Sequence, residues 1–360
     1  MINPAARPGS LKVIWLIPPI VTPYASGEDP ERNLLACPRA SARLRIAVAA
    51  LEWRQCGNEN VFLDPAEIDY ARPIGWETAG ICVVPKYYHD VPLQPWLDAC
   101  AAAIGSDCRL VIDICDYPFR KTEGVQAFYS RVLQTCDAVV VNSEKMGELI
   151  APYTPRRPLV IEDAILGSMA EPAFAPAAKV ELLWFGHPTN LPFVVTQIEA
   201  LARFASRRRC RLTVVTEDCA EVTRWIQAIN AHFAPAFDAR LIPWSQETQR
   251  GALHECDLVL VPSDPADALK AGASANRIAE ALNAGRFPVA SPLPSYLAFA
   301  EAAWLGQDLV QGIEWALANR DEVLSRIRRG QVLVAEKFAA DRVGRQWRQL
   351  FESLVSLPDR

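Results

Sequence analysis

The stretch KAGASANRIAEALNAGRFPVAS, which begins at Lys270, places small, polar and charged residues directly before an apolar run. Gly272 would allow a ligand to approach the backbone closely, and Ser274 is a suitable N-cap for a following helix. The unpaired N–H groups of a first helical turn form a site for an anion. Asn276 and Glu280 would share one helix face, about 6 Å apart along the axis. This spacing suits a diphosphate at the helix tip and a ribose beside the carboxylate.

The same stretch has a simpler interpretation. Arg277 and Glu280 are three residues apart, so they could pair on the exposed face of an ordinary amphipathic helix. In the first interpretation Lys270 could add positive charge beside the phosphates. The residues alone leave both interpretations open.

Other candidate ligand contacts follow two further expected strands. The loop GHPTN runs from Gly186 to Asn190 after the apolar VELLWF, so its backbone N–H groups could face a phosphate. His187 could contact phosphate or sugar, or it could be an ordinary loop histidine. Trp244 could stack on a nucleotide base, or it could be a core residue, since the chain has ten tryptophans.

A third set of candidates lies in the first half of the chain. Arg43 is near the start of an expected helix whose tip could meet an anionic ligand, and Lys86 and His89 follow the strand ICVVP. Asp113 and Asp116 end the run RLVIDICD and are predicted to form an acidic pair facing a cleft. Such a pair could orient a hydroxyl group or act as a base, or the two carboxylates could cap the next turn.

The elements that must position these residues form two series of alternating strands and helices. Strands that are apolar on both faces and separated by helices indicate parallel sheets covered on both sides. We therefore predict an α/β fold with two Rossmann-like doubly wound domains facing each other across a cleft. The expected parts are a first domain over 1–165, a second over 166–335 and a C-terminal helix over 336–360 that crosses back to the first domain.

Two long helices are expected in the second half. One covers PFVVTQIEALARFASRR, residues 192–208, and the other covers GQVLVAEKFAADRVGRQWRQLFESLV, residues 330–355. Ligands of open parallel sheets bind beyond the carboxyl ends of the strands, which is where the candidate residues lie.

The composition argues against several classes of protein. A net charge of −5 over 360 residues makes nucleic acid an unsuitable main partner. The ten cysteines and four histidines show no metal-ligand spacing, so we predict no metal site and no cofactor. The start of the chain does not read as a signal peptide, and no apolar run reaches the roughly 18 residues of a membrane span. We expect a cytoplasmic protein with at most peripheral membrane contact through its basic clusters.

The pattern K-x3-S-A-N-R-x2-E in the first stretch resembles the donor-binding segment of GT-B glycosyltransferases. The similar group contains the retaining glycogen synthases and bacterial mannosyl- and glucosyltransferases. The resemblance continues in order through VIDICDYPF, CDAVVVNSEKMGELI, LLWFGHPTNLPFV and LIPWSQETQRGALHECDLVLVPSD. It implies that the helix tip formed by Ser274, Ala275, Asn276 and Arg277 binds the nucleotide diphosphate and that Glu280 binds the ribose.

The sequence departs from that group at one position. The group carries two glutamates in this segment, and the position of the first holds Gly272 here. In the group that glutamate lies near the sugar and the reacting centre. Lys270 or Asp267 could occupy its space in a variant subgroup, and a protein that binds without turnover is the alternative.

The resemblance implies a metal-independent glycosyltransferase that moves a sugar from a nucleotide-activated donor to an acceptor hydroxyl. The acceptor would be a glycan, a lipid-linked molecule or a small molecule, in the synthesis of a bacterial surface polysaccharide or glycolipid. The catalytic candidates are Asp113, Asp116, His187 and Lys270. A sugar-nucleotide epimerase of the same fold and a non-catalytic nucleotide- or sugar-binding partner subunit are the alternatives.

Overall fold

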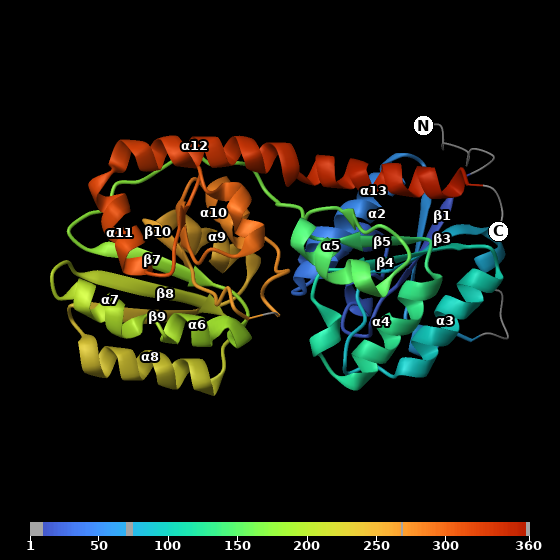
Figure 1. Cartoon of the computed structure of the whole chain (residues 1–360), viewed down its shortest axis with the longest axis horizontal. Coiled ribbons are helices and arrows are strands. Elements are labelled where there is room, and N and C mark those ends of the chain that lie inside the picture. Colours follow the sequence, from blue (N-terminus) through green and yellow to red (C-terminus); the bar gives the residue numbers. More distant parts are fainter. Residues whose placement is uncertain (1–9, 70–74, 268, 358–360) are drawn as a thin grey trace. The chain divides into compact units, whose positions relative to one another are not determined.

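The computed structural model describes residues 10–69, 75–267 and 269–357, and its contacts divide the chain into two compact units. Unit 1 contains the chain up to Leu166, residues 272–274 and the chain from Lys337 onward. Unit 2 contains Gly167–Ala271 and Ala275–Glu336. Among the described residues each unit is built on one six-stranded parallel sheet with helices between the strands (Figure 1). The expected α/β fold with two parallel sheets is confirmed.

The sheet of unit 1 has the strand order β2-β1-β3-β4-β5-β6. Its strands are β1 (Lys12–Leu16), β2 (Glu59–Leu63), β3 (Ala79–Val84), β4 (Arg109–Ile114), β5 (Ala138–Val141) and β6 (Leu159–Val160). Its helices are α1 (Pro30–Asn33), a π-helix (Ala42–Ala47), α2 (Val48–Gln55), α3 (Leu93–Gly105), α4 (Glu123–Thr135), α5 (Glu144–Ile150) and α13 (Ala340–Val355).

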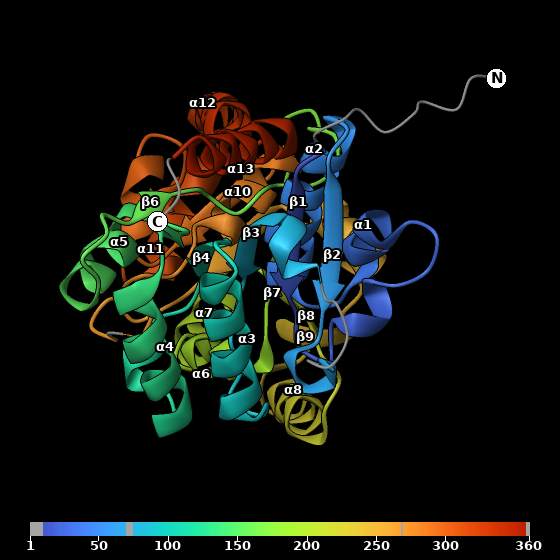
Figure 2. The same cartoon turned by 90° about the vertical axis from the view of Figure 1, so that its right-hand side faces the viewer.

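Alternating side chains of the unit 1 strands fill two separate cores. Ile14 and Leu16 of β1 belong to the core that α3 and α4 cover, whereas Val13 and Trp15 belong to the core that α2 and α13 cover. Figures 1 and 2 show these helix layers on the two faces of the sheet. The two-sided burial explains why the strands are apolar throughout.

The sheet of unit 2 has the strand order β12-β11-β10-β7-β8-β9. Its strands are β7 (Val180–Phe185), β8 (Cys210–Thr216), β9 (Phe237–Pro243), β10 (Leu258–Val261), β11 (Phe287–Ala290) and β12 (Trp304–Leu305). Its helices are α6 (Leu191–Val195), α7 (Ile198–Ala205), α8 (Ala220–Phe233), α9 (Gln246–Glu255), α10 (Asn276–Asn283), α11 (Leu309–Ala318) and α12 (Arg320–Lys337).

Gly285 connects α10 to the buried strand β11. Its φ of +70° is in the left-handed region, and a Cβ at this position would collide with the backbone carbonyl oxygen of Glu171. A glycine is therefore required both by the backbone conformation and by the close approach of a neighbouring segment. Gly285 therefore ends the helical segment and begins the turn into β11.

Both long helices expected in the second half are interrupted. The predicted helix over 192–208 divides into α6 and α7 at Thr196, whose hydroxyl donates to the Phe193 carbonyl at 2.9 Å and competes with the helical backbone. The predicted helix over 330–355 divides into α12 and α13. At this break Ala339 is extended with ψ of 134°, and the Phe338 carbonyl accepts the backbone N–H of Ile165 at 2.8 Å.

Candidate functional site

Helix α10 of unit 2 begins at Asn276, and its N-cap is Ala275, which makes no side-chain capping bond. The prediction that Ser274 is the N-cap is therefore wrong by one residue, because Ala275 still has a non-helical ψ of 11°. Gly272 and Ser274 group with unit 1 by their contacts, whereas Lys270 and the helix itself are in unit 2. The first turn of α10 still presents its backbone N–H groups at a helix N-terminus.

Arg277, in the first turn of α10, has an incompletely satisfied guanidinium. Its Nη2 donates to the Tyr296 hydroxyl at 3.4 Å. Its Nη1 is buried and, within the part of the chain that the structure describes, has no hydrogen-bond partner. An ideal Cβ at Gly186 would lie 3.7 Å from that Nη1, so the guanidinium lies beside the loop after β7. Arg277 is therefore not the solvated surface residue of the simpler interpretation, and its buried charge requires an acceptor.

Glu280 is held in a hydrogen-bonded chain with two residues of the β9–α9 segment. Gln249 Nε2 donates to Glu280 Oε2 at 3.2 Å, and Trp244 Nε1 donates to Gln249 Oε1 at 2.7 Å. All three residues are partly buried. Trp244, expected near a base, and Glu280, expected near a ribose, are thus connected through one glutamine. Their ligand roles stay predictions.

The loop after β7 and the loop before α10 meet through Lys270. Its Nζ donates to Asn190 Oδ1 at 2.6 Å and lies 5.7 Å from the centre of the Phe193 ring. His187 is exposed and caps the short 3-10 helix Pro188–Asn190, because its Nδ1 accepts the N–H of Thr189 at 3.3 Å. The structure therefore brings together Gly186, Asn190, Lys270 and Arg277, all proposed from the sequence.

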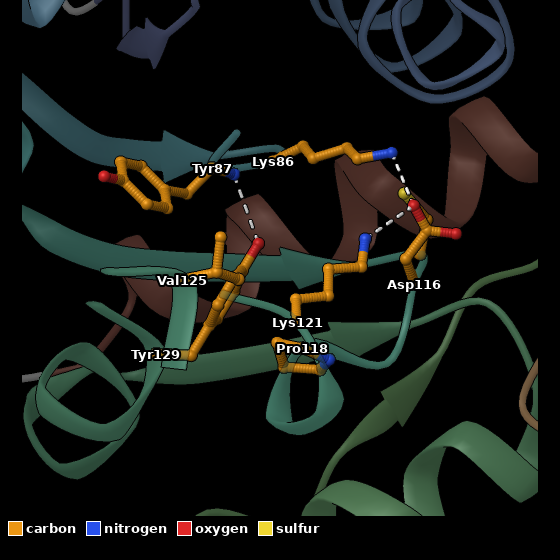
Figure 3. Close-up of a pocket in the computed structure, with 8 residues that line it drawn as sticks. Lys86, Tyr87, Asp116, Pro118, Lys121, Val125 and Tyr129 are labelled. Atoms are coloured by element: carbon orange, nitrogen blue, oxygen red, sulfur yellow. Dashed lines mark hydrogen bonds and ion pairs between the residues drawn. The ribbon is translucent and has the colours of Figure 1, made fainter. Parts of the chain in front are cut away.

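In unit 1 a small pocket follows the carboxyl ends of β3 and β4 (Figure 3). Lys86 Nζ lies 2.6 Å and Lys121 Nζ lies 3.2 Å from the same oxygen of Asp116, Oδ2. Partial removal from water alone would raise the pKa of Asp116, whose side chain is 49% exposed, but the two ammonium groups hold it well below its usual range. Burial disfavours charge on Lys86 too, yet the Asp116 carboxylate raises the pKa of its amine well above the usual value. Asp116 and Lys86 are therefore charged at neutral pH.

Asp113 and Asp116 do not form the predicted cleft-facing acidic pair. Asp113 is 1% exposed and accepts from Arg45 Nη2 at 2.6 Å and from Arg45 Nε at 2.7 Å. Arg45 Nη1 also donates to Asp163 at 2.8 Å. Burial raises the pKa of Asp113, and Arg45 opposes that shift. Asp113 is therefore part of a buried ionic network, because it lies within β4, whereas Asp116 lies beyond the end of that strand.

The other two candidates from the first half of the chain are Arg43, which is buried, and His89, which is exposed. Arg43 is buried in the π-helix, and its Nη1 donates to the Cys37 and Pro38 carbonyls at 2.7 and 2.8 Å. Its guanidinium therefore stabilises the preceding loop, and a role of Arg43 in acceptor binding stays a prediction. His89 is exposed beyond β3.

Sequence reasoning missed several residues of these two sites. They are Gln249 in unit 2, and Arg45, Lys121, Tyr129 and Asp163 in unit 1. The run SARLRIAVAA did contain a signal for Arg45, because a charge inside an apolar stretch is expected to be paired when it is buried. No comparable signal marks Gln249, which lies in a polar segment.

The described residues contain neither a metal-ligand cluster nor a helix that could span a membrane. In residues 10–69, 75–267 and 269–357, no three His, Cys, Asp or Glu side chains gather as a metal site would require. No helix of the described chain combines the length and the apolar character needed to cross a membrane.

Comparisons with known proteins identify the fold. No protein-family model matches the chain, and no curated protein matches its sequence. A glycosyltransferase from Rickettsia africae has a TM-score of 0.68 at 10% identity, with 97% of this chain and 100% of that chain covered. HepE of Anabaena, solved with UDP-glucose, has a TM-score of 0.67 at 12% identity, with 95% and 100% covered. Sucrose-phosphate synthase from Thermosynechococcus elongatus has a TM-score of 0.66 at 12% identity, with 96% and 99% covered.

These likenesses extend over nearly the whole of each chain. They show that this chain has the two-sheet α/β fold of GT-B glycosyltransferases. Because fold alone does not determine activity, the function must be argued from the residues of the sites.

Proposed function

We propose that this protein is a glycosyltransferase that moves a sugar from a nucleotide-activated donor to an acceptor hydroxyl. Unit 2 would bind the donor and unit 1 the acceptor, as the resemblance of each half to GT-B enzymes implies. The similar structures support the proposal, since one of them, HepE, was solved with UDP-glucose.

The buried, unpartnered Nη1 of Arg277 is the observation that carries the proposal. A guanidinium N–H that is buried without an acceptor is costly, so this position favours a ligand that supplies negative oxygen. The first turn of α10 adds backbone N–H groups at the positive end of a helix, and Lys270 adds a second cation on the loop beside Asn190. A nucleotide diphosphate satisfies all of these donors, and Glu280 is one helical turn further along for the ribose.

The chemistry follows from these positions. The acceptor oxygen bonds to the anomeric carbon of the donor sugar while the bond to the diphosphate breaks, and the acceptor proton is released. Arg277, Lys270 and the tip of α10 would stabilise the negative charge that develops on the leaving diphosphate. We propose that they replace a metal ion, that no cofactor is needed beyond the nucleotide-sugar and that the enzyme is a retaining member of the glycogen-synthase-like group. A cytoplasmic role in surface polysaccharide or glycolipid synthesis belongs to the same proposal.

Nucleotide binding by Glu280 variants tests the donor site. A thermal-shift screen with UDP, GDP, CDP, CMP, ADP and dTDP identifies the base, since a ligand of the native state raises the melting temperature. Calorimetric titration with that nucleotide should show binding weakened about tenfold or more in Glu280→Ala and less in Glu280→Gln, because a hydrogen bond to a charged group is lost. Glu247→Ala, an exposed glutamate of α9, is the matched control and should bind like the parent.

Unchanged affinity in Glu280→Ala would show that the donor-site assignment is wrong. Sugar-nucleotide consumption, measured with and without an acceptor, separates the transferase from an epimerase. A transferase consumes the donor rapidly only when the acceptor is present, whereas an epimerase converts it equally well alone.

A further inference from the structure

Two lysines in the unit 1 pocket share a single carboxylate. The Nζ atoms of Lys86 and Lys121 lie 2.6 and 3.2 Å from the same oxygen of Asp116, and Figure 3 shows both side chains directed at it. Two ammonium groups against one carboxylate leave one positive charge that no other side chain lining the pocket balances, although the buried Asp113 is close enough to Lys86 to interact with it. Cys115 does not balance it, because burial raises the pKa of its thiol to about 12 and keeps it neutral.

The pocket also contains hydrogen-bond donors that are not fully used. An ammonium group has three N–H bonds, and among the described residues Lys86 Nζ contacts Asp116 and the face of the Tyr88 ring, 5.0 Å from the ring centre. The Tyr129 hydroxyl accepts the backbone N–H of Tyr87 at 3.2 Å. Among the described residues the hydrogen of that hydroxyl meets no acceptor. An anion could therefore be bound without displacing every existing contact.

The position and the size of the pocket limit what it can hold. It lies beyond the carboxyl ends of two adjacent parallel strands, where open α/β sheets bind their ligands. About 200 Å³ of it is unfilled by atoms, including space open to solvent. The enclosed part of the pocket is about 10 Å³, the room of about one water molecule, so the pocket can take one small charged group at its solvent-open mouth and not a complete substrate.

We propose that this pocket binds an anionic group, a carboxylate or a phosphate, carried by the sugar acceptor. The identification of the acceptor as the molecule that carries this group rests on the proposed function. The expectation that the pocket binds an anion rests only on the charges of the pocket itself. Lys86 and Lys121 provide the charge-assisted bonds, and Asp116 acts as an internal anion that holds the two lysines in place until the ligand arrives.

The structure also allows a simpler role, in which the three side chains only connect the turn after β4 to the end of β3. The two explanations predict opposite results for Asp116→Asn. If the pocket binds an anion, removal of the competing carboxylate strengthens binding. If the cluster is only structural, the variant is less stable and binds no anion more tightly than the parent does.

Calorimetric titration of the full chain at low ionic strength, with glucose, glucuronate and glucose 6-phosphate as probes, tests the proposal. We expect at least one anionic probe to bind more tightly than glucose by about tenfold or more, because the bond to a charged group is absent with glucose. Lys121→Gln should weaken that binding about tenfold and Asp116→Asn should strengthen it. Preference for glucose 6-phosphate assigns the pocket to a phosphate, and preference for glucuronate assigns it to a carboxylate.

Lys145→Gln is the matched control. Lys145 and Lys121 side chains are both 36% exposed and both pair with one carboxylate, but Lys145 pairs with Glu148 outside the pocket. Equal affinities for the three probes, or equal binding by the two lysine variants, would overturn the proposal. Loss of nucleotide binding in the donor screen, with anion binding retained and sensitive to Lys121, would reject the proposed function but leave the anion pocket in place.

Discussion

At the scale of single residues, two aspartates three positions apart have different roles. Asp113 is fully buried and bonded to Arg45, whereas the Asp116 side chain is 49% exposed and bonded to two lysines. A buried charge that loses its partner is left in a medium that solvates it poorly, whereas an exposed charge regains water. The same chemical change should therefore have very different effects at the two positions.

Asp113→Asn should lower the free energy of unfolding by about 3 kcal/mol or more, because Arg45 keeps its buried charge and loses two charged bonds. Asp116→Asn should lower it by at most about 1 kcal/mol, since that carboxylate is half exposed and screened by water. Urea unfolding of both variants at neutral pH measures the difference. Comparable losses in the two proteins would mean that the buried network does not stabilise unit 1.

At the scale of elements, the connection from α10 to β11 positions the candidate donor site. The strand is fully buried, and Gly285 allows the chain to turn from the helix into it. Any displacement of this turn would move the start of β11 and the end of α10 together. The glycine therefore contributes to the site although it touches none of the candidate ligand contacts.

Gly285→Ala should destabilise the protein by about 2 kcal/mol or more, because a left-handed conformation alone costs a residue with a Cβ about 1–2 kcal/mol and the clash with Glu171 adds to it. Gly251→Ala is the control, since Gly251 is inside helix α9 and a Cβ there meets nothing within 4 Å. That variant should be neutral or more stable by about 0.5–1 kcal/mol. Chemical unfolding compares the two, and a Gly285→Ala protein as stable as the parent would contradict the argument.

At the scale of the whole molecule, each of the two units carries positive groups at a candidate site of its own. In unit 2 a helix tip, Arg277 and Lys270 offer N–H donors; in unit 1 two lysines surround one carboxylate. Positive side chains and backbone N–H groups can stabilise a leaving diphosphate as a divalent cation does in other enzymes.

Transfer activity and nucleotide affinity should consequently be unchanged by EDTA. The measurement is the turnover rate before and after exhaustive chelation. The donor is a nucleotide-sugar that contains the base identified by the thermal-shift screen. Calorimetry with the free nucleotide under the same conditions provides the control for binding alone. Loss of activity on chelation, with recovery on addition of Mg²⁺ or Mn²⁺, would contradict the proposed role of Arg277 and Lys270.

Much of the architecture was predictable because its causes are local. LLWF in β7 and LVI in β4 are apolar at successive positions, and only a strand covered on both faces buries such a run completely. The glycine at the end of α10 is likewise a local steric requirement. The breaks in the two long helices were not predicted, because the composition stays helical across both of them. One break has a threonine hydroxyl bonded to its own turn, and the other has a backbone hydrogen bond from Ile165.

The sequence by itself determined the α/β class, the parallel strands and the approximate place of helix α10, the candidate donor-binding helix, since side-chain periodicity and backbone sterics act between near neighbours. Only the tertiary structure decided which charges meet. Arg45 reaches Asp113 across 68 positions and Asp163 across 118, and Gln249 reaches Glu280 across 31. These pairs depend on strand register and helix packing, which no local pattern encodes. For this reason Asp113 belongs to a buried ionic network, whereas Asp116 lines a pocket with two lysines.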